Sequence, residues 1–169
     1  MTDAFRSKVE GWVRRLGSTP VEVADPATAW HVQFDYPKNT PHHMHAAMPS
    51  GQPGMVVIVS VLNVGHEHLK AFDELDAGSQ EEFLYELRHV LNVPEAEFNL
   101  EGAGKPIECP KTITITCTRY DDGLTLDSFA RSVGAVYKSF LNALWTLQHR
   151  LGGQKPGPAD RFDFKRLGT

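Results

Sequence analysis

Residues 55–62 form an almost wholly apolar run that is rich in valine and isoleucine, and this run restricts the choice of fold more than any other segment. β-Branched residues pack well on a pleated sheet, and a continuous apolar strand is typical of a position covered on both faces. We therefore predict that this run is the central strand of a sheet. The segments around it must then supply the neighbouring strands and the helices that cover them.

Polar and apolar residues alternate in segments on either side of the predicted central strand. The clearest example is residues 30–36, in which Trp30, Val32 and Phe34 alternate with polar residues. A period of two residues is that of a strand with one buried face. Four segments are predicted to be strands on this basis: residues 30–36, 42–48, 97–100 and 112–120.

Apolar residues recur at spacings of three and four in the other segments, as they do in helices with one buried side. Ser79 is the predicted N-cap of one helix, with Glu82 three residues later as the second member of a capping box. Thr125 is the predicted N-cap of the last helix. The predicted helices are residues 3–16, 66–75, 79–91 and 125–151.

The helix predicted for residues 125–151 has a wider apolar surface than packing against one side of a sheet requires. Its main stripe consists of Phe129, Val133, Val136, Phe140, Leu144 and Leu147. A second stripe beside it consists of Ala130, Tyr137, Leu141 and Trp145. Such a surface is typical of a deeply buried helix or of a subunit interface, and both can hold at once. We expect Tyr137, Leu141 and Trp145 to contact a second copy of the chain or another protein.

Together these elements predict an α+β fold in which helices flank an antiparallel sheet, in the order α-β-β-β-α-β-β-α. Residues 1–152 are expected to form one domain, because 169 residues suit a single domain of ordinary size. Residues 153–169 are expected to be a linker rich in glycine and proline, followed by a C-terminal tail. The predicted core contains Trp30, Phe34, Val57, Val59, Ile113, Ile115, Phe129, Val136 and Phe140.

The charge and the apolar runs of the chain exclude several classes of partner. Its 17 basic and 21 acidic residues give a net charge of -4, whereas nucleic acids and anionic membranes attract basic surfaces. The most apolar run, residues 55–64, has about half of the ~20 residues that a membrane-spanning helix needs. The N-terminal residues lack the pattern of a signal peptide, and Cys109 and Cys117 are the only cysteines. We therefore expect a cytoplasmic protein with no membrane insertion.

Histidines gather in and near the second predicted strand. If residues 42–48 form a strand, His43 and His45 point to the same face, and the candidate third ligand is His31 on the neighbouring strand, or else His66 or His68. Three neutral imidazoles hold zinc well, so His31, His43 and His45 form a candidate metal site. The alternative is that this strand is simply a polar edge strand that faces solvent.

No set of residues in the sequence has the spacing of a known catalytic site, so no catalytic residue is predicted. Cys109 has no base beside it in the sequence to activate a thiolate. Residues 101–106 contain two glycines and a lysine, but they lack the spacing and the hydroxyl residue of a phosphate-binding loop.

The order of the predicted elements resembles the secretion-chaperone-like fold, which class I type III secretion chaperones share with several uncharacterised bacterial and archaeal families. The resemblance covers about residues 3–151. Two local features support it: the threonine-rich residues 111–120 lead through Asp121-Asp122-Gly123 into the last helix, and residues 132–137 are similar to the last-helix segment of one such family. The resemblance implies a small acidic homodimer that binds a segment of another protein or helps to regulate one. This chain differs from the chaperones in its histidine content, its tail and its smaller negative charge.

Three functions are consistent with these observations. The first is a non-enzymatic, homodimeric protein-binding or chaperone-like module, which follows from the resemblance and from the wide apolar surface of the last helix. The second is a metal-binding protein or metal-dependent enzyme that uses His31, His43 and His45, with zinc as its metal. The third is a sensor that binds a small molecule in a pocket between the sheet and the helices.

Overall fold

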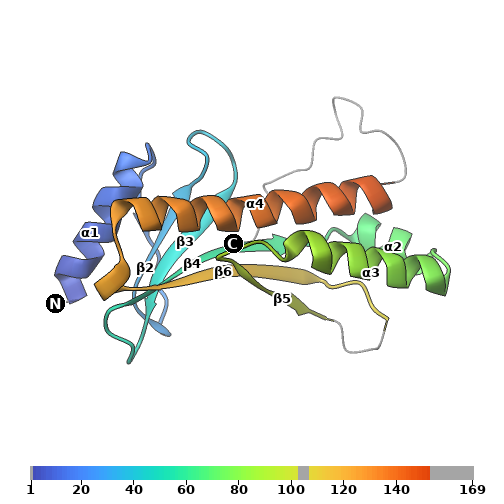
Figure 1. The fold of residues 1–169 in the computed structure, drawn as a ribbon, viewed down its shortest axis with the longest axis horizontal. Helices are drawn as coiled ribbons and strands as arrows, with labels where there is room; N and C mark the ends of the chain where they lie inside the picture. Colours follow the sequence, from blue (N-terminus) through green and yellow to red (C-terminus); the bar gives the residue numbers. More distant parts are fainter. Residues whose placement is uncertain (1, 103–106, 153–169) are drawn as a thin grey trace. The chain divides into compact units, whose positions relative to one another are not determined.

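The computed structural model describes residues 2–102 and 107–152, which form an α+β fold with four α-helices and a six-stranded sheet (Figure 1). This confirms the predicted fold class and the predicted order of elements. The helices are α1 (Thr2–Arg15), α2 (His66–Asp73), α3 (Ala77–Leu91) and α4 (Leu126–Leu151), with a short 3-10 helix η1 (Asp121–Gly123) before α4. The strands are β1 (Val21–Glu22), β2 (Thr28–Asp35), β3 (His43–Pro49), β4 (Met55–Asn63), β5 (Glu97–Glu101) and β6 (Thr112–Tyr120).

The strands follow the order β1-β2-β3-β4-β6-β5, and the pairs β1–β2, β2–β3 and β3–β4 are antiparallel. The short strand β1 had no counterpart among the predicted strands. Because β3 lies between β2 and β4, the alternative prediction of an edge strand at residues 42–48 is wrong.

The described residues divide into two compact units. Unit 1 consists of residues 2–60 and 116–137, and unit 2 of residues 61–102, 107–115 and 138–152. The chain passes from one unit to the other within β4, β6 and α4, so each of these elements contributes to both.

Unit 1 has its core on one face of β2, β3 and β4. Phe34 lies opposite Met44, and Val32 opposite Ala46, and these side chains are at most 1% exposed. The helices add aromatic contacts to this face: the ring of Phe5 in α1 packs edge-on against Trp30, and Trp12 packs against Phe129 of α4. These contacts explain the alternation of β2, because only one face of the strand meets the helices.

Unit 2 is built around the inner sides of α3 and α4. The buried apolar side chains that these two helices contribute to unit 2 are Phe83, Leu84, Leu87, Leu91, Phe140, Ala143, Leu144, Leu147 and Leu151. Phe72 of α2 stacks edge-on against Phe83 at 5.6 Å, and Ile113 and Ile115 of β6 are fully buried. The predicted main stripe of the last helix is therefore confirmed at Phe140, Leu144 and Leu147, and in unit 1 it is confirmed at Phe129, Val133 and Val136.

The prediction that β4 is covered on both faces is wrong. Val56, Ile58 and Ser60 are buried, whereas Val57 and Val59, which point to the opposite face, are only half-buried. The two valines were predicted in the core because an apolar run does not distinguish its two faces. The other seven predicted core residues are buried: Trp30, Phe34, Ile113, Ile115, Phe129, Val136 and Phe140.

The N-cap of α3 also differs from the prediction. The cap is Asp76 rather than Ser79, and its carboxylate accepts hydrogen bonds from the backbone N–H of Ser79 at 3.0 Å and from the Ser79 hydroxyl at 2.7 Å. These bonds lower the pKa of Asp76. A carboxylate caps as well as a hydroxyl does and also interacts favourably with the positive end of the helix, so the earlier residue takes the role.

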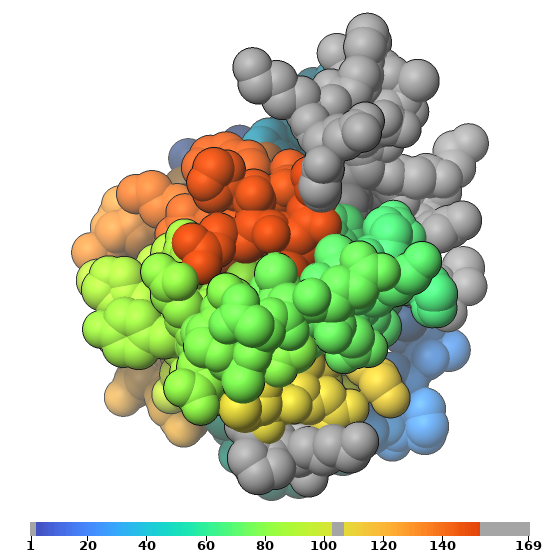
Figure 2. Space-filling model, turned by 90° about the vertical axis from the view of Figure 1, so that its right-hand side faces the viewer, coloured from blue at the N-terminus to red at the C-terminus, as the bar shows by residue number. Residues whose placement is uncertain are grey.

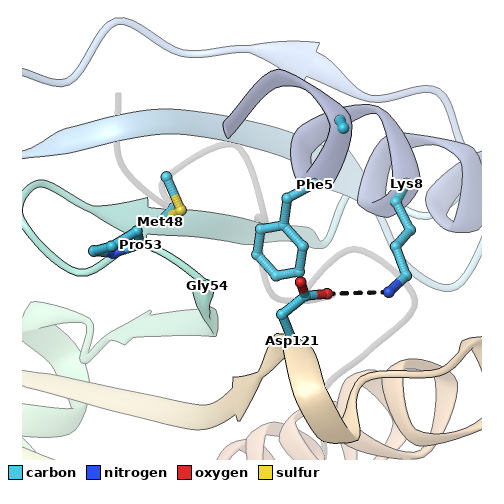
Figure 3. A pocket seen from close by; sticks show the side chains of 7 residues that line it. Phe5, Lys8, Met48, Pro53, Gly54 and Asp121 are labelled. Carbon is cyan, nitrogen blue, oxygen red and sulfur yellow. Dashed lines mark hydrogen bonds and ion pairs between the residues drawn. The ribbon is translucent and has the colours of Figure 1, made fainter. Parts of the chain in front are cut away.

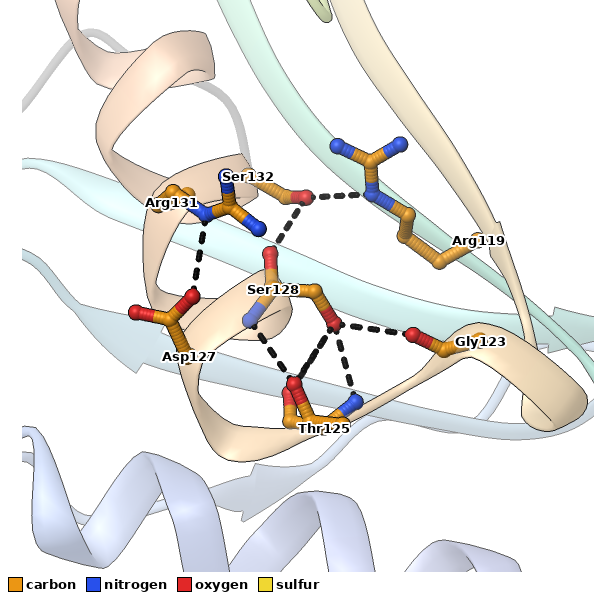
Figure 4. Close-up of polar contacts among 7 residues, drawn as sticks. All are labelled: Arg119, Gly123, Thr125, Asp127, Ser128, Arg131 and Ser132. Atoms are coloured by element: carbon orange, nitrogen blue, oxygen red, sulfur yellow. Dashed lines mark hydrogen bonds and ion pairs between the residues drawn. The ribbon is translucent and has the colours of Figure 1, made fainter.

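At the start of α4 the prediction of a Thr125 cap is confirmed. The Thr125 hydroxyl accepts from the backbone N–H of Ser128 at 3.1 Å, and the Ser128 hydroxyl accepts from the backbone N–H of Thr125 at 2.8 Å (Figure 4). The network continues because Ser132 donates to the carbonyl of Ser128 and accepts from Arg119 Nε, both at 2.8 Å. The first turn of α4 is thereby tied to the end of β6.

Replacing Thr125 with alanine is expected to lower the free energy of unfolding by about 1 kcal/mol, because one backbone N–H at the start of α4 loses its acceptor. Thr125→Ser keeps the hydroxyl and should retain most of the stability. Urea denaturation of both variants measures the effect. Equal stabilities for the alanine and serine variants would contradict the capping role.

Among the described residues, no helix combines the length and the apolar character that crossing a lipid bilayer demands. The predicted linker and tail, residues 153–169, lie outside the described residues.

Candidate functional site

The three residues of α4 that were predicted to form a protein interface have different surroundings in the structure. Trp145 is 58% exposed, whereas Leu141, one turn earlier on the same side of α4, is half-buried. Trp145 lies on the side of α4 away from the buried residues Phe140 and Ala143, and Leu141 lies at the edge between the buried and the exposed sides. The described part of unit 2 therefore presents a large aromatic side chain to solvent on the outer side of α4, where Lys138 and His149 are also exposed.

Tyr137 is engaged within unit 1. Its ring packs edge-on against Tyr36 at 5.4 Å and lies tilted against His42 at 5.2 Å. Burial, with a smaller effect of Tyr36, raises the pKa of the Tyr137 hydroxyl. Of the three predicted contact residues, Trp145 is thus the most available to a partner.

The structure brings together two of the three histidines predicted to bind metal. His31 on β2 and His45 on β3 point to the same face of the sheet, and His31 Nε2 lies 2.9 Å from His45 Nδ1. On its other side, His31 Nδ1 lies 3.4 Å from an Asp25 carboxylate oxygen. Burial, followed by the neighbouring His31, lowers the pKa of His45 to about 4, so this imidazole is neutral near pH 7.

His43 has a different partner. Its Nδ1 lies 2.7 Å from the carboxylate of Asp35, which is directly opposite it on β2. Within the described residues, no group of three or more histidine, cysteine, aspartate or glutamate side chains is placed to hold a metal ion. The geometry thus supplies a pair of facing imidazoles, with His43 beside it hydrogen-bonded to Asp35.

A buried polar pair links β4 to the segment before β3. His42 is 2% exposed and Ser60 fully buried, and the Ser60 hydroxyl lies 2.9 Å from His42 Nε2. His42 Nδ1 donates to the carbonyl of Tyr36 at 2.7 Å, so Nε2 accepts from Ser60 in the neutral ring. Burial lowers the pKa of His42 to about 4. The sequence analysis missed this pair, because only the pairing of distant strands brings the two residues together.

The Ser60–His42 pair has the contact of a nucleophile with a base, but both side chains are buried away from any substrate. Cys109 is also buried, and burial raises the pKa of its thiol to about 12. The thiol therefore stays protonated near neutral pH, a state in which cysteine is a poor nucleophile. As they are placed in the structure, neither Ser60 nor Cys109 is an exposed nucleophile.

One pocket of about 380 Å³ lies in unit 1 (Figure 3). Its apolar wall includes Phe5 and Met48, which are 6% and 3% exposed. At its mouth, Lys8 Nζ lies 3.1 Å from the carboxylate of Asp121. The volume is at the small end for ligand pockets, and the sensor hypothesis remains a prediction. The lining residues are Ala4, Phe5, Lys8, Met48, Pro53, Gly54 and Asp121.

One protein family matches the chain. Its description is "Uncharacterized conserved protein (DUF2299)", and the match covers residues 5–147. No curated protein sequence matches the chain.

Two solved structures are similar to the described fold. The first is an uncharacterized protein from Methanothermobacter thermautotrophicus, with 25% sequence identity and a TM-score of 0.78, covering 87% of this chain and 99% of that one. The second is the HopA1-SchA chaperone-effector complex, with 11% identity and a TM-score of 0.48, covering 86% of this chain and 92% of that one. The second likeness is too weak to indicate a function.

Proposed function

Because this chain belongs to the family of uncharacterized conserved proteins DUF2299, we propose a function from its own geometry: a protein-binding module without catalytic chemistry, which acts as a homodimer in the cytoplasm. The observation that carries the proposal is the exposure of Trp145 on α4. With Leu141 one turn away, it forms an apolar face that we call the outer face of α4 (Leu141 and Trp145).

Tryptophan is the side chain most suited to anchor a protein contact. It buries up to about 250 Å² of surface, and it is enriched among the residues that dominate binding energy. Leu141 and Trp145 are four residues apart, so their side chains are neighbours on one side of the helix. A partner that covers both would remove a continuous apolar area from water.

The helix that presents this face is held rigidly within unit 2. Ser139 and Asn142 of α4 donate to the carbonyls of Leu91 and Val90 at the end of α3, both at 3.1 Å. Near the other end, Arg150 pairs with Glu82 at 3.3 Å and with Glu86 at 3.4 Å. Figure 2 shows the last turns of α4 beside α3. Because the helix backbone that carries the outer face is already ordered, it loses little conformational entropy when a partner binds.

A second copy of the chain is the proposed partner on this face. Most soluble oligomers are two-fold homodimers, in which one patch contacts the same patch of the other subunit. Apolar residues suit such a contact, since like charges would repel across the two-fold axis. Binding of another protein then uses the remaining surface of the dimer.

The double substitution Leu141→Glu and Trp145→Glu is expected to convert the dimer into folded monomers, because two carboxylates would face two others across the interface. Light scattering coupled to gel filtration, at micromolar concentrations, measures the mass of the wild type and the variant. Circular dichroism shows whether the variant is folded.

The control is Tyr85→Glu, which replaces an aromatic residue of α3 that is 72% exposed with one glutamate. This variant should remain dimeric, because Tyr85 lies outside the proposed interface. A wild-type protein of monomeric mass would refute the homodimer. If the double variant does not fold, the outer face belongs to the core and the assignment of the interface fails.

A further inference from the structure

We propose that His31 and His45 bind one divalent late transition-metal ion, with copper(II) held most tightly, through His31 Nε2 and His45 Nδ1. This inference goes beyond the proposed function, since both residues lie in unit 1 and neither belongs to the outer face of α4. It rests on the spacing of the two rings, on the carboxylate behind one of them and on the strands that position them.

The distance between the two nitrogen atoms suits a shared metal ion. His31 Nε2 and His45 Nδ1 are 2.9 Å apart and share a hydrogen bond, so a metal ion would take the place of the proton between them. Two nitrogen ligands about 2.05 Å from a metal and at a right angle lie about 2.9 Å from each other, whereas a tetrahedral angle separates them by about 3.3 Å. The strands therefore hold the two nitrogen atoms within reach of one metal ion, which small rotations of the rings would admit. Among divalent ions, copper(II) has the highest affinity for imidazole sites.

Asp25 prepares His31 for this role. In a metal complex both facing nitrogen atoms must be unprotonated, so the proton of His31 must sit on Nδ1. That atom is buried without a hydrogen-bond partner among the described residues, and the Asp25 carboxylate lies 3.4 Å away. A small movement of the Asp25 carboxylate toward His31 would let it accept a hydrogen bond from Nδ1–H. Metal-bound histidines usually donate their other ring N–H to a carboxylate or a carbonyl in this way. No net proton has to leave the pair, because only the ring that donates the hydrogen bond has to move its proton to its other nitrogen, while the accepting neutral ring already carries its proton there.

The sheet fixes the relative position of the two rings. Gln33 is directly opposite His45, and His31 is the next residue on the same face of β2. The other face of these strands is packed, since Val32, Met44 and Ala46 are at most 1% exposed. The side chain of His31 is 15% exposed, so solvent can supply the remaining ligands of the metal. Two imidazoles on a packed sheet thus form a chelate without rearrangement of the backbone.

The test uses the full-length protein without an affinity tag. Isothermal titration with copper(II), in the presence of glycine as a competing chelator, should give one site per chain. The electron paramagnetic resonance spectrum of the copper complex should show coupling to two imidazole nitrogens. A spectrum without imidazole coupling, or with four equivalent nitrogens, would overturn the assignment without any variant.

Variants identify the ligands. Removing a residue that supports a metal ligand typically weakens metal binding about 10–100-fold. His31→Ala and His45→Ala each remove a ligand itself, so each should weaken copper binding by at least this much. Asp25→Asn should fall within that 10–100-fold range, because it alters only the support of His31. His43→Ala is the matched control, since His43 is on the same strand face but is paired with Asp35. It should retain the affinity and the spectrum of the wild type.

Two results would refute the two-histidine site. One is wild-type affinity in both His31→Ala and His45→Ala, and the other is a loss in His43→Ala as large as theirs. If an alanine variant does not fold, His31→Gln preserves the size and polarity of the side chain and takes its place. Neither result depends on the oligomeric state, so the homodimer and the metal site are tested separately.

Discussion

Replacing Phe140 with alanine is expected to lower the free energy of unfolding by about 3–5 kcal/mol. Phe140 is fully buried in the core of unit 2, on the inner side of α4. Next to it in the sequence, Ser139 donates to the carbonyl of Leu91 at 3.1 Å and holds α4 against the end of α3. The surrounding helices therefore cannot close around a smaller side chain. The loss of stability then has two parts, the lost apolar contacts of the ring and the cavity that remains.

The control for this prediction is Leu141→Ala. Leu141 is the next residue of the same helix but is only half-buried, so its truncation should cost much less in a dissociated monomer. Chemical denaturation at low protein concentration compares the two variants with the wild type. A loss below about 1 kcal/mol for Phe140→Ala would show that the inner stripe of α4 is misplaced.

The stripe that contains Phe140 shows which parts of this fold the sequence determines. Its residues recur at helical spacing, and the structure buries all six predicted members. The burial of Trp30, Val32 and Phe34 was equally predictable, because buried and less buried residues alternate along a strand with one packed face. Both signals are local, since each depends on residues a few positions apart.

Features that depend on distant segments were harder to predict. Val57 and Val59 were expected in the core, yet the helices of unit 1 pack on the face of Trp30 and Val56 instead. Nothing within an apolar strand shows which of its faces the helices will cover. The prediction of the N-cap of α3 was wrong for a different reason. Asp76 and Ser79 are both good capping residues, and Asp76 comes first in the chain.

The histidines combine both situations. The two-residue period of β3 correctly placed His43 and His45 on one face. The register of β2 and β3 then decides the contacts: it sets Asp35 against His43 and brings His31 to His45. The register is not visible in either strand alone, so the sequence indicated a group of three where the structure forms a pair. In the same way, His42 had no visible partner until β4 brought Ser60 to it.

Lowering the pH from 7 to 4 is expected to cost the wild-type protein about 3 kcal/mol of stability through His42 alone. Burial lowers the pKa of His42 from 6.5 to about 4 in the folded protein, while the unfolded chain keeps the ordinary value. Between these values the unfolded state binds a proton that the folded state does not, so stability falls as the pH falls. The loss begins near pH 6.5 and is complete below about pH 4.

The physical reason is that the cavity around His42 is arranged for a neutral ring. Burial keeps water from the ring and disfavours its charged form, although the hydrogen bond from Nδ1 to the carbonyl of Tyr36 favours that form. The nearby charges oppose one another, because Asp35 favours the charged ring and His43 disfavours it. Desolvation therefore decides the direction of the shift.

The measurement compares wild type with His42→Gln by urea denaturation at intervals between pH 7 and pH 4. The variant should be the less stable protein at pH 7, because glutamine fits the two hydrogen bonds less well. The difference should shrink by about 3 kcal/mol as the pH falls, since only the wild type carries the titrating ring. Other groups titrate in both proteins and cancel in the comparison. His66→Gln removes an exposed histidine and should not produce this convergence. Parallel curves for wild type and His42→Gln would mean that the buried imidazole takes up its proton without cost, which would contradict the lowering of its pKa by burial.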